Sequence, residues 1–134
     1  MPQATLSATL SFLPPGVAAA CQAAMSVVSN YTSMEGGTLD IPDATVSGTV
    51  FALPFGSVNQ DARAFVFKNT NNQDMWLRLN GSSNLYRVPP NGSIFIAHPA
   101  DASGGSPTPL LSASVVLTAN QSGSGTVNYY VFGL

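Results

Sequence analysis

The sequence predicts an all-β fold, an antiparallel β-sandwich of jelly-roll type with about eight strands. Apolar and polar residues alternate with a period of two in several short runs, which is the pattern of strands that bury one face. Turn residues, mainly Gly, Pro, Asn and Ser, separate these runs at regular spacing. We therefore expect a helical share below about 15%, against the usual 30–35%.

The composition limits the size of the fold and the kinds of partner. At 134 residues the chain has the length of one domain, and 7% of its residues are charged, against about 25% in ordinary domains. Four basic residues against six acidic ones argue against binding to nucleic acid or, through charge, to a membrane. The apolar runs are too short for a transmembrane helix, and no Lys or Arg precedes Arg63, so a secretory signal is not expected. A neutral polar surface suits a protein that packs against others.

We expect residues 1–30 to hold an N-terminal strand followed by an apolar arm or short helix, and residues 31–134 to form the β-sandwich of the same domain. Residues 5–12 alternate Leu, Ala and Phe with Thr and Ser, which predicts a half-buried strand that Pro14-Pro15-Gly16 ends. Residues 17–29 are rich in Ala and favour a short helix, whereas their valines favour a strand. A short helix or an irregular arm is expected there.

Residues 30–43 contain Asn, Gly-Gly and Pro and are expected to be mainly loop, with a short strand at 38–41. A strand is predicted over residues 45–53, where apolar and polar residues alternate again. The central stretch from residue 65 to residue 98 holds the single Trp and the single His. Strands are predicted in its apolar runs, at residues 65–67, 75–80, 85–88 and 93–97.

Turn chemistry separates the strands of the central stretch. Residues 69–74 are expected to form a hairpin loop, because Asn and Asp tolerate left-handed backbone. Asn80-Gly81 and the segment 89–92 are expected to be tight turns, with Asn and Gly at positive φ. Trp76 is expected to pack in the core between the sheets, since its neighbours in the run are apolar.

The last two strands are predicted at residues 110–118 and 126–132. A Pro-rich loop over residues 99–109 precedes them, and a Ser/Gly turn over residues 120–125 joins them. No charged residue follows Asp101. Because exposed sheet edges are usually protected by charge, these strands are expected in sheet centres or under a partner.

Residues that could carry chemistry are few and scattered. His98 and Cys21 are too far apart to suggest a metal site, and nothing marks a serine as a nucleophile. Cys21 lies among alanines, has no second Cys to pair with, and is expected to be a buried, inert thiol. Glu35, Asp40 and Asp43 could supply the two carboxylates of a glycosidase but are expected to be solvated loop acids. We assign no catalytic, cofactor-binding or metal-binding residue and expect that the chain is not an enzyme.

Aromatic residues leave a second interpretation open. Several could stack sugars on a lectin-like face, although their places in strands favour core packing: Trp76, Tyr86, Phe95, Tyr129, Tyr130 and Phe132. An exposed cluster of Trp76 and Tyr86 beside polar Asn groups would favour sugar binding. The Asn-x-Ser/Thr patterns are expected to be chance matches in a chain without a signal peptide: Asn30, Asn80, Asn91 and Asn120.

Three segments of the central stretch form a familiar combination. They are Val66-Phe67-Lys68-Asn69-Thr70, Trp76-Leu77-Arg78-Leu79 and Val88-Pro89-Pro90-Asn91-Gly92-Ser93-Ile94. Together they resemble small β-sandwich proteins of tailed-phage virions. The resemblance covers roughly a quarter of the chain. It implies a capsid decoration (cement) protein, a jelly roll that oligomerises on the outer shell and has no catalytic residues.

The resemblance and the low charge together predict a structural virion protein, made in the host cytoplasm, that binds and stabilises the outer surface of a phage head. The expected partners are the lattice of the major capsid protein and the chain itself, as a homotrimer or homodimer. Nucleic acid, membranes and cofactors are not expected partners. Residues 1–30 are expected to reach onto a neighbouring subunit or the shell. The alternative is a carbohydrate- or receptor-binding module of a phage tail or fibre.

Overall fold

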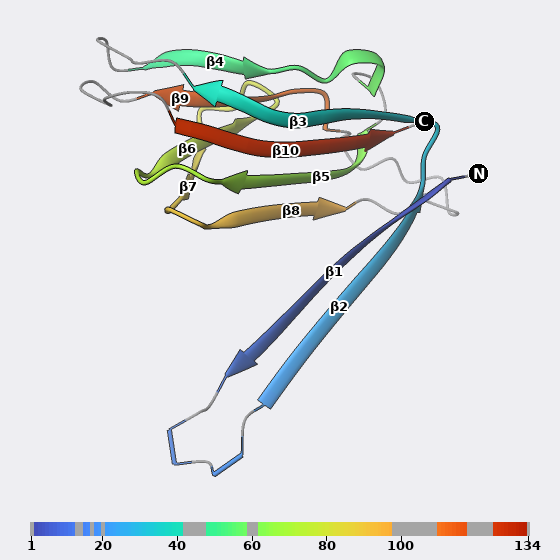
Figure 1. The fold of residues 1–134 in the computed structure, drawn as a ribbon, viewed down its shortest axis with the longest axis vertical. Helices are drawn as coiled ribbons and strands as arrows, with labels where there is room; N and C mark the ends of the chain where they lie inside the picture. The colour runs from blue at the N-terminus through green and yellow to red at the C-terminus, as the bar shows by residue number, and fades with distance from the viewer. Residues whose placement is uncertain are drawn as a thin grey trace.

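The computed structural model describes residues 2–12, 15–16, 18–19, 21–41, 48–58, 62–97, 110–117 and 125–133. These residues form ten strands and a 3-10 helix of three residues, so the predicted all-β fold is confirmed. In chain order the elements are β1 (Gln3–Phe12), β2 (Cys21–Asn30), β3 (Ser33–Ile41), β4 (Thr49–Leu53), η1 (Gly56–Val58), β5 (Ala62–Asn69), β6 (Met75–Leu79), β7 (Leu85–Val88), β8 (Ser93–Ala97), β9 (Ala113–Leu117) and β10 (Gly125–Gly133). Figure 1 shows β3 to β10 packed together, with β1 and β2 standing away from them as a hairpin.

The strands from β3 to β10 form two four-stranded antiparallel sheets. One has the order β3-β10-β5-β8 and is called the β10 sheet, and the other has the order β4-β9-β6-β7 and is called the β9 sheet. In these sheets only β6 and β7 are neighbours both in sequence and in a sheet, because the other connections cross between the sheets. This is the connectivity of an eight-stranded jelly roll, as the sequence predicted.

The core lies between the two sheets, and period-two alternation decides which residues enter it. In β10, Val127, Tyr129 and Val131 are buried, whereas Asn128 and Tyr130 point outwards. The strands β5, β6 and β9 add further buried side chains, among them Phe65, Phe67, Met75, Leu77, Val115 and Leu117. The alternate positions of the same strands therefore form the outer faces of the sheets.

Two tight turns form as predicted. Asn80 and Gly81, in the hairpin between β6 and β7, have φ values of 50° and 65°. Between β7 and β8, the Gly92 amide donates to the Pro89 carbonyl at 2.8 Å, and Asn91 has a φ of 61° as expected, whereas Gly92 does not have the positive φ expected for it. Asn and Gly adopt this left-handed region at the lowest cost, which is why they occupy these positions.

The expectation of a helix or irregular arm over residues 17–29 is wrong, because β2 pairs with β1 over all ten residues of each strand. A short Ala-rich helix is marginal by itself, since its nucleation is costly. The antiparallel ladder satisfies the same backbone groups instead. It places Leu6 opposite Val27 and Leu10 opposite Ala23, so apolar positions of the two strands meet in register.

Residues 33–41, expected to be mainly loop, form β3 at an edge of the β10 sheet. Gly36 and Gly37 do not break this strand, although their φ values are 143° and 145°. A Cβ on Gly36 would overlap the carbonyl oxygen of Tyr129 and lie 2.7 Å from the Cα of Tyr130. Gly36 therefore permits the close approach of β3 to β10 and does not make a turn.

Residues 69–74 do not close a hairpin as expected, because they carry the chain from β5 in the β10 sheet to β6 in the β9 sheet. Strands β9 and β10 have neighbours on both sides, which confirms the central position expected for these charge-free strands. Their lack of charge therefore needs no partner molecule to explain it. The loop predicted at 99–109 and most of the turn at 120–125 lie outside the described residues.

Trp76 does not lie between the sheets, contrary to expectation. Along β6, Met75 and Leu77 point into the core and are fully buried, whereas Trp76 is half-buried on the outer face of the β9 sheet. It is the register partner of Val116 in β9 and of Arg87 in β7. A strand places only alternate residues on the core side, and Met75 and Leu77 already hold those positions.

Candidate interaction surfaces

The hairpin of β1 and β2, which we call the arm, has an apolar face and a polar face. Along β1, Leu6, Ala8 and Leu10 share one face, and Thr5 and Thr9 lie on the other. The positions that pair with the three apolar residues in β2 are apolar as well. Leu10 is 63% exposed. Since a two-stranded hairpin is marginally stable in water by itself, the apolar face requires a cover.

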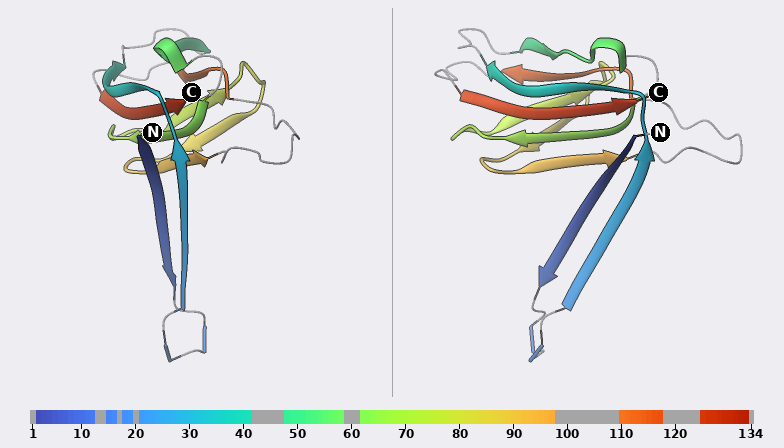
Figure 2. Two further views of the ribbon diagram at one scale, coloured as in Figure 1. Left: turned by 90° about the vertical axis from the view of Figure 1, so that its right-hand side faces the viewer. Right: turned by 45° about the vertical axis from the view of Figure 1, so that its right-hand side comes forward.

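The arm is fixed to the jelly roll at its base. The Tyr31 amide donates to the Pro2 carbonyl at 3.1 Å, and the Thr32 amide donates to the Gly133 carbonyl at 2.8 Å. The Tyr31 ring packs edge-on against Phe132, with ring centroids 5.1 Å apart. Figure 2 shows in both views that the arm leaves one end of the β10 sheet and points away from the body.

The outer face of the β10 sheet is apolar at the end nearest to the arm. Cross-strand pairs place Tyr130 of β10 beside Val66 of β5, and Val66 beside Phe95 of β8. The adjacent row pairs Met34 of β3 with Phe132 of β10. Met34, Tyr130 and Phe95 are 53%, 43% and 52% exposed. Because neighbouring strands lie about 4.8 Å apart, these five side chains form one surface, which we call the apolar patch.

The other end of the same face is polar. Thr38, Asn128 and Lys68 lie in register across β3, β10 and β5, and the Thr38 hydroxyl donates to the Asn128 Oδ1 at 2.8 Å. Asp40 follows two residues farther along β3, where it pairs with Thr126. The charges of Lys68 and Asp40 therefore lie at the end away from the arm.

The sugar-stacking hypothesis needs Trp76 and Tyr86 on one face. Tyr86 is the register partner of Leu77, whose side chain is in the core, whereas Trp76 is the partner of Arg87. The two aromatic residues therefore belong to opposite sides of the β9 sheet and do not form one platform.

Glu35 and Asp40, the two described carboxylates among the three considered for a glycosidase, are not brought together. Glu35 lies on the core side of β3 and Asp40 on its outer side, because they are an odd number of positions apart in one strand. Asp43 and His98 lie outside the described residues, and so does the side chain of Cys21. Within the described part, no three His, Cys, Asp or Glu side chains form a group that could hold a metal ion.

Tyr129 joins β10 to the segment that follows β4. Its ring is buried, and its hydroxyl donates to the Pro54 carbonyl at 2.8 Å. Burial, and to a lesser degree the negative charge of Glu35, raise the pKa of Tyr129 above its ordinary value of 10.0. A neutral hydroxyl that is held by a main-chain carbonyl serves the fold.

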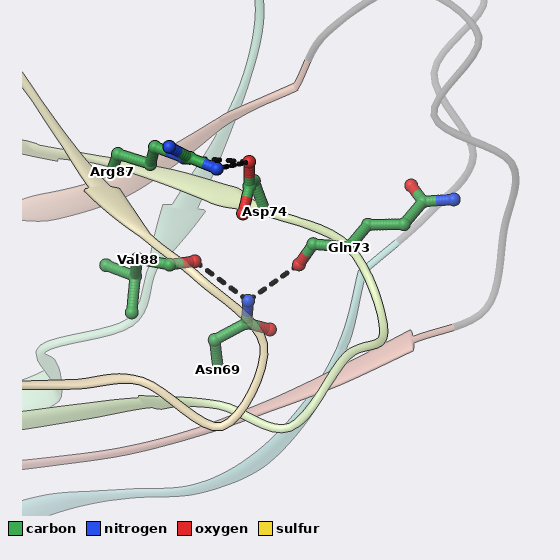
Figure 3. A network of polar contacts seen from close by, with 5 residues as sticks. All are labelled: Asn69, Gln73, Asp74, Arg87 and Val88. Carbon is green, nitrogen blue, oxygen red and sulfur yellow. Dashed lines mark hydrogen bonds and ion pairs between the residues drawn. The ribbon is translucent and has the colours of Figure 1, made fainter.

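The Asn69 side chain connects separate parts of the jelly roll through hydrogen bonds. Figure 3 shows its amide nitrogen donating to the Gln73 carbonyl at 2.7 Å and to the Val88 carbonyl at 2.9 Å. The side chain is fully buried, so these bonds tie the loop after β5 to the end of β7. Nearby on the surface, Arg87 of β7 forms an ion pair at 2.7 Å with Asp74, the last residue before β6.

Asn80, which matches the glycosylation pattern, also serves the fold. Its Oδ1 accepts hydrogen bonds from the amides of Leu111 at 2.7 Å and Ser112 at 3.2 Å. The main-chain amide of Asn80 donates to the Ser112 carbonyl at 2.9 Å. These bonds attach the turn between β6 and β7 to the segment that leads into β9.

The apolar patch was missed by the sequence analysis, because its members come from strands that are far apart in the chain. Met34, Val66, Phe95 and Tyr130 meet only through the order β3-β10-β5-β8. One local signal exists: residues 126–132 carry apolar side chains at both odd and even positions. A strand of that kind has apolar groups on both of its faces.

No family model, no curated protein and no solved structure matches the chain. None of the helical segments in the described ranges has the length and apolar character to cross a membrane. The function is therefore argued from the arm, the apolar patch and the chemistry of the surface.

Proposed function

We propose that the chain is a structural virion protein that decorates the outer surface of a phage head, and not an enzyme. Its partners are the lattice of the major capsid protein and other copies of itself. The observation that carries the proposal is the arm, an amphipathic hairpin held away from a jelly roll whose core is already filled. Such an element contributes to an assembly when its apolar face is buried on another subunit.

The low charge of the chain supports the same function. The first charged residue is Glu35, so the whole arm is uncharged. Contacts made by the arm therefore depend on apolar burial and hydrogen bonds, which salt does not screen. Attachment to the lattice is expected to change little with ionic strength.

The polar side chains described above hold the fold together, as a scaffold protein requires. Asn69, Asn80 and Tyr129 each bond to main-chain groups and join separate strands or loops. A rigid body of this kind can carry an arm without taking part in chemistry. In this proposal the protein is made in the host cytoplasm and remains on the virion surface.

A carbohydrate- or receptor-binding module of a phage tail or fibre is the second candidate. Trp76 favours it, because the ring lies on the outer face of the β9 sheet beside Arg87, where an aromatic side chain can stack on a sugar. The position of Tyr86 on the other side of the sheet argues against it, since the two aromatics do not act together.

Co-sedimentation with capsids assembled from the major capsid protein of the same genome tests the proposal. The full chain is expected to sediment with capsids equally at low and high salt. Leu6→Asp with Leu10→Asp charges the apolar face of the arm and is expected to weaken binding at least about tenfold. Thr5→Asp with Thr9→Asp adds the same charge to the opposite face and is expected to keep the binding.

Urea unfolding is the control for the fold. At a protein concentration low enough to keep every variant monomeric, both double variants are expected to unfold at the wild-type urea concentration, because the arm lies outside the core. Deleting residues 1–30 is likewise expected to weaken attachment to capsids more than it weakens the fold. A full chain that does not sediment with capsids, yet binds a sugar array in a way that Trp76→Ala abolishes, would establish the second candidate instead.

A further inference from the structure

Two apolar surfaces are left uncovered by the residues that the structure describes. One is the apolar face of the arm, where Leu10 is largely exposed, and the other is the apolar patch, where Met34, Tyr130 and Phe95 are about half exposed. Proteins that remain monomeric seldom expose large apolar surfaces. Each surface therefore needs an apolar partner of similar extent.

The arm cannot cover the patch of its own subunit. Only Tyr31 and Thr32 connect β2 to β3, and their amides are bonded to the Pro2 and Gly133 carbonyls. The Tyr31 ring is also packed on Phe132 at the rim of the patch. Folding the arm back onto its own sheet would break these contacts and would require a reversal within two residues. Since no other described segment covers Met34, Tyr130 and Phe95, a second molecule is the expected cover.

The arm is long enough to cross the patch and brings no charge to it. A ten-residue strand extends about 34 Å, and the four strands of the β10 sheet span about 19 Å. Residues 1–34 contain no charged side chain, and Lys68 and Asp40 lie beyond the patch. An arm from another copy that lies across the patch therefore leaves Lys68 and Asp40 outside the contact.

Two such contacts bury an area of the size found in weak, reversible pairs. A hairpin about 10 Å wide that crosses the four strands over about 19 Å covers roughly 200 Å². Two contacts bury four surfaces of this size, about 800 Å² in total, which lies below the ~1,200 Å² of stable specific interfaces, so the pair is expected to dissociate on dilution.

We propose that the apolar patch is the docking surface for the arm of a second copy of this chain, and that two copies exchange their arms. The inference rests on the homo-oligomer of the proposed function and names the partner of both surfaces. In one subunit the two surfaces adjoin at the contact of Tyr31 with Phe132. A two-fold axis beside this contact places each arm on the patch of the other subunit, which gives a closed, self-complementary interface.

Light scattering on the full chain tests the self-association without any capsid. The expected mass is twice 13.8 kDa and does not change at high salt. Tyr130→Ser with Phe95→Ser is expected to raise the Kd of association at least about tenfold. Val50→Ser is the matched control, because Val50 is 48% exposed on the outer face of the β9 sheet, and it should keep the wild-type mass. If the Tyr130→Ser/Phe95→Ser protein and the Val50→Ser protein lost association to the same degree, the assignment of the patch would be contradicted.

Mixing two defective proteins tests whether the arm is the occupant. Leu10→Asp disables the arm and keeps the patch, whereas Phe95→Asp disables the patch and keeps the arm. Each protein alone is expected to associate more weakly than the wild type, and the mixture is expected to associate more strongly than either protein alone, because one intact arm meets one intact patch. A mixture that associates no more than either protein alone, at concentrations up to those where either protein alone begins to associate, would overturn the arm exchange.

Capsid binding separates this inference from the proposed function. If the wild-type chain is monomeric but sediments with capsids, and Leu10→Asp abolishes this sedimentation, the arm binds the shell and the exchange of arms is overturned. If the wild-type chain is a dimer that Leu10→Asp and Phe95→Asp each disrupt, but never sediments with capsids, the exchange is supported and the decoration function is refuted.

Discussion

Replacing Asn69 by Ala is expected to destabilise the protein far more than an ordinary polar-to-alanine change. The side chain is fully buried and holds the carbonyls of Gln73 and Val88 and the amide of Asn71, at 2.7, 2.9 and 2.9 Å. The bond to Val88 is buried, and the other two are partly buried. Alanine removes all three hydrogen bonds at once.

The size of the effect follows from these three groups. A buried polar group left without a partner costs about 1–3 kcal/mol, and a group near the surface regains part of this from water. The full loss at Val88 and a fraction of it at each of the other two groups give about 2–4 kcal/mol. That is a large part of the 5–15 kcal/mol that stabilises an ordinary domain.

Urea unfolding, followed by the fluorescence of Trp76 as the single tryptophan, measures this loss. Asn72→Ala, at an exposed position of the same loop, is the control and should change the free energy of unfolding by less than about 0.5 kcal/mol. Asn69→Asp places a carboxylate against two carbonyl oxygens. It should be at least as unstable as Asn69→Ala at neutral pH and should gain stability on acidification, when the acid can donate. If Asn69→Ala unfolded at the same urea concentration as the wild type, the structural role assigned to Asn69 would be refuted.

Three further changes test other contacts. Because burial and Glu35 raise the pKa of Tyr129, the unfolded chain loses this proton first, so the free energy of unfolding should fall as the pH rises above about 10. In a urea series from pH 9 to 12, Tyr129→Phe should flatten that fall. Gly36→Ala should lower the melting temperature more than Gly37→Ala, since both have positive φ but an added Cβ meets neighbouring backbone only at Gly36. Trp76→Ala, at a half-buried position, should cost less than the about 3–5 kcal/mol of a core Trp in urea unfolding.

Local alternation was enough to place most strands, but it was applied incompletely within β6. The run at 126–132 predicted a strand, and its lack of charge predicted a place in a sheet centre or under a partner. The structure has the strand and places it in the centre of the sheet. In β6 the same alternation assigns Met75 and Leu77 to the core, yet the apolar neighbours of Trp76 in the run suggested that it belonged there too. Position within the strand, and not the apolar character of the sequence neighbours, decides which face a side chain takes.

The arm and the apolar patch depend on contacts between distant residues. The Ala-rich composition of residues 17–29 favours a helix only weakly, because helix propensities differ by at most about 1 kcal/mol per residue among residues other than Pro. The ten register pairs with β1 outweigh this preference and make β2 a strand. Met34, Tyr130 and Phe95 become neighbours only when the strand order of the sheet is known. The apolar patch follows from topology, and no single segment of the chain contains it.

Hydrogen exchange of the backbone amides of β1 and β2, measured on the full chain over a range of protein concentrations, is the sharpest test of whether another copy covers the arm. An uncovered two-stranded hairpin opens readily and exchanges fast. We expect the amides of the arm to be protected at high concentration and to lose this protection on dilution, while the amides of β10 in the core stay protected throughout. Arm amides that exchange at the rate of an unstructured peptide at every concentration would contradict the exchange of arms.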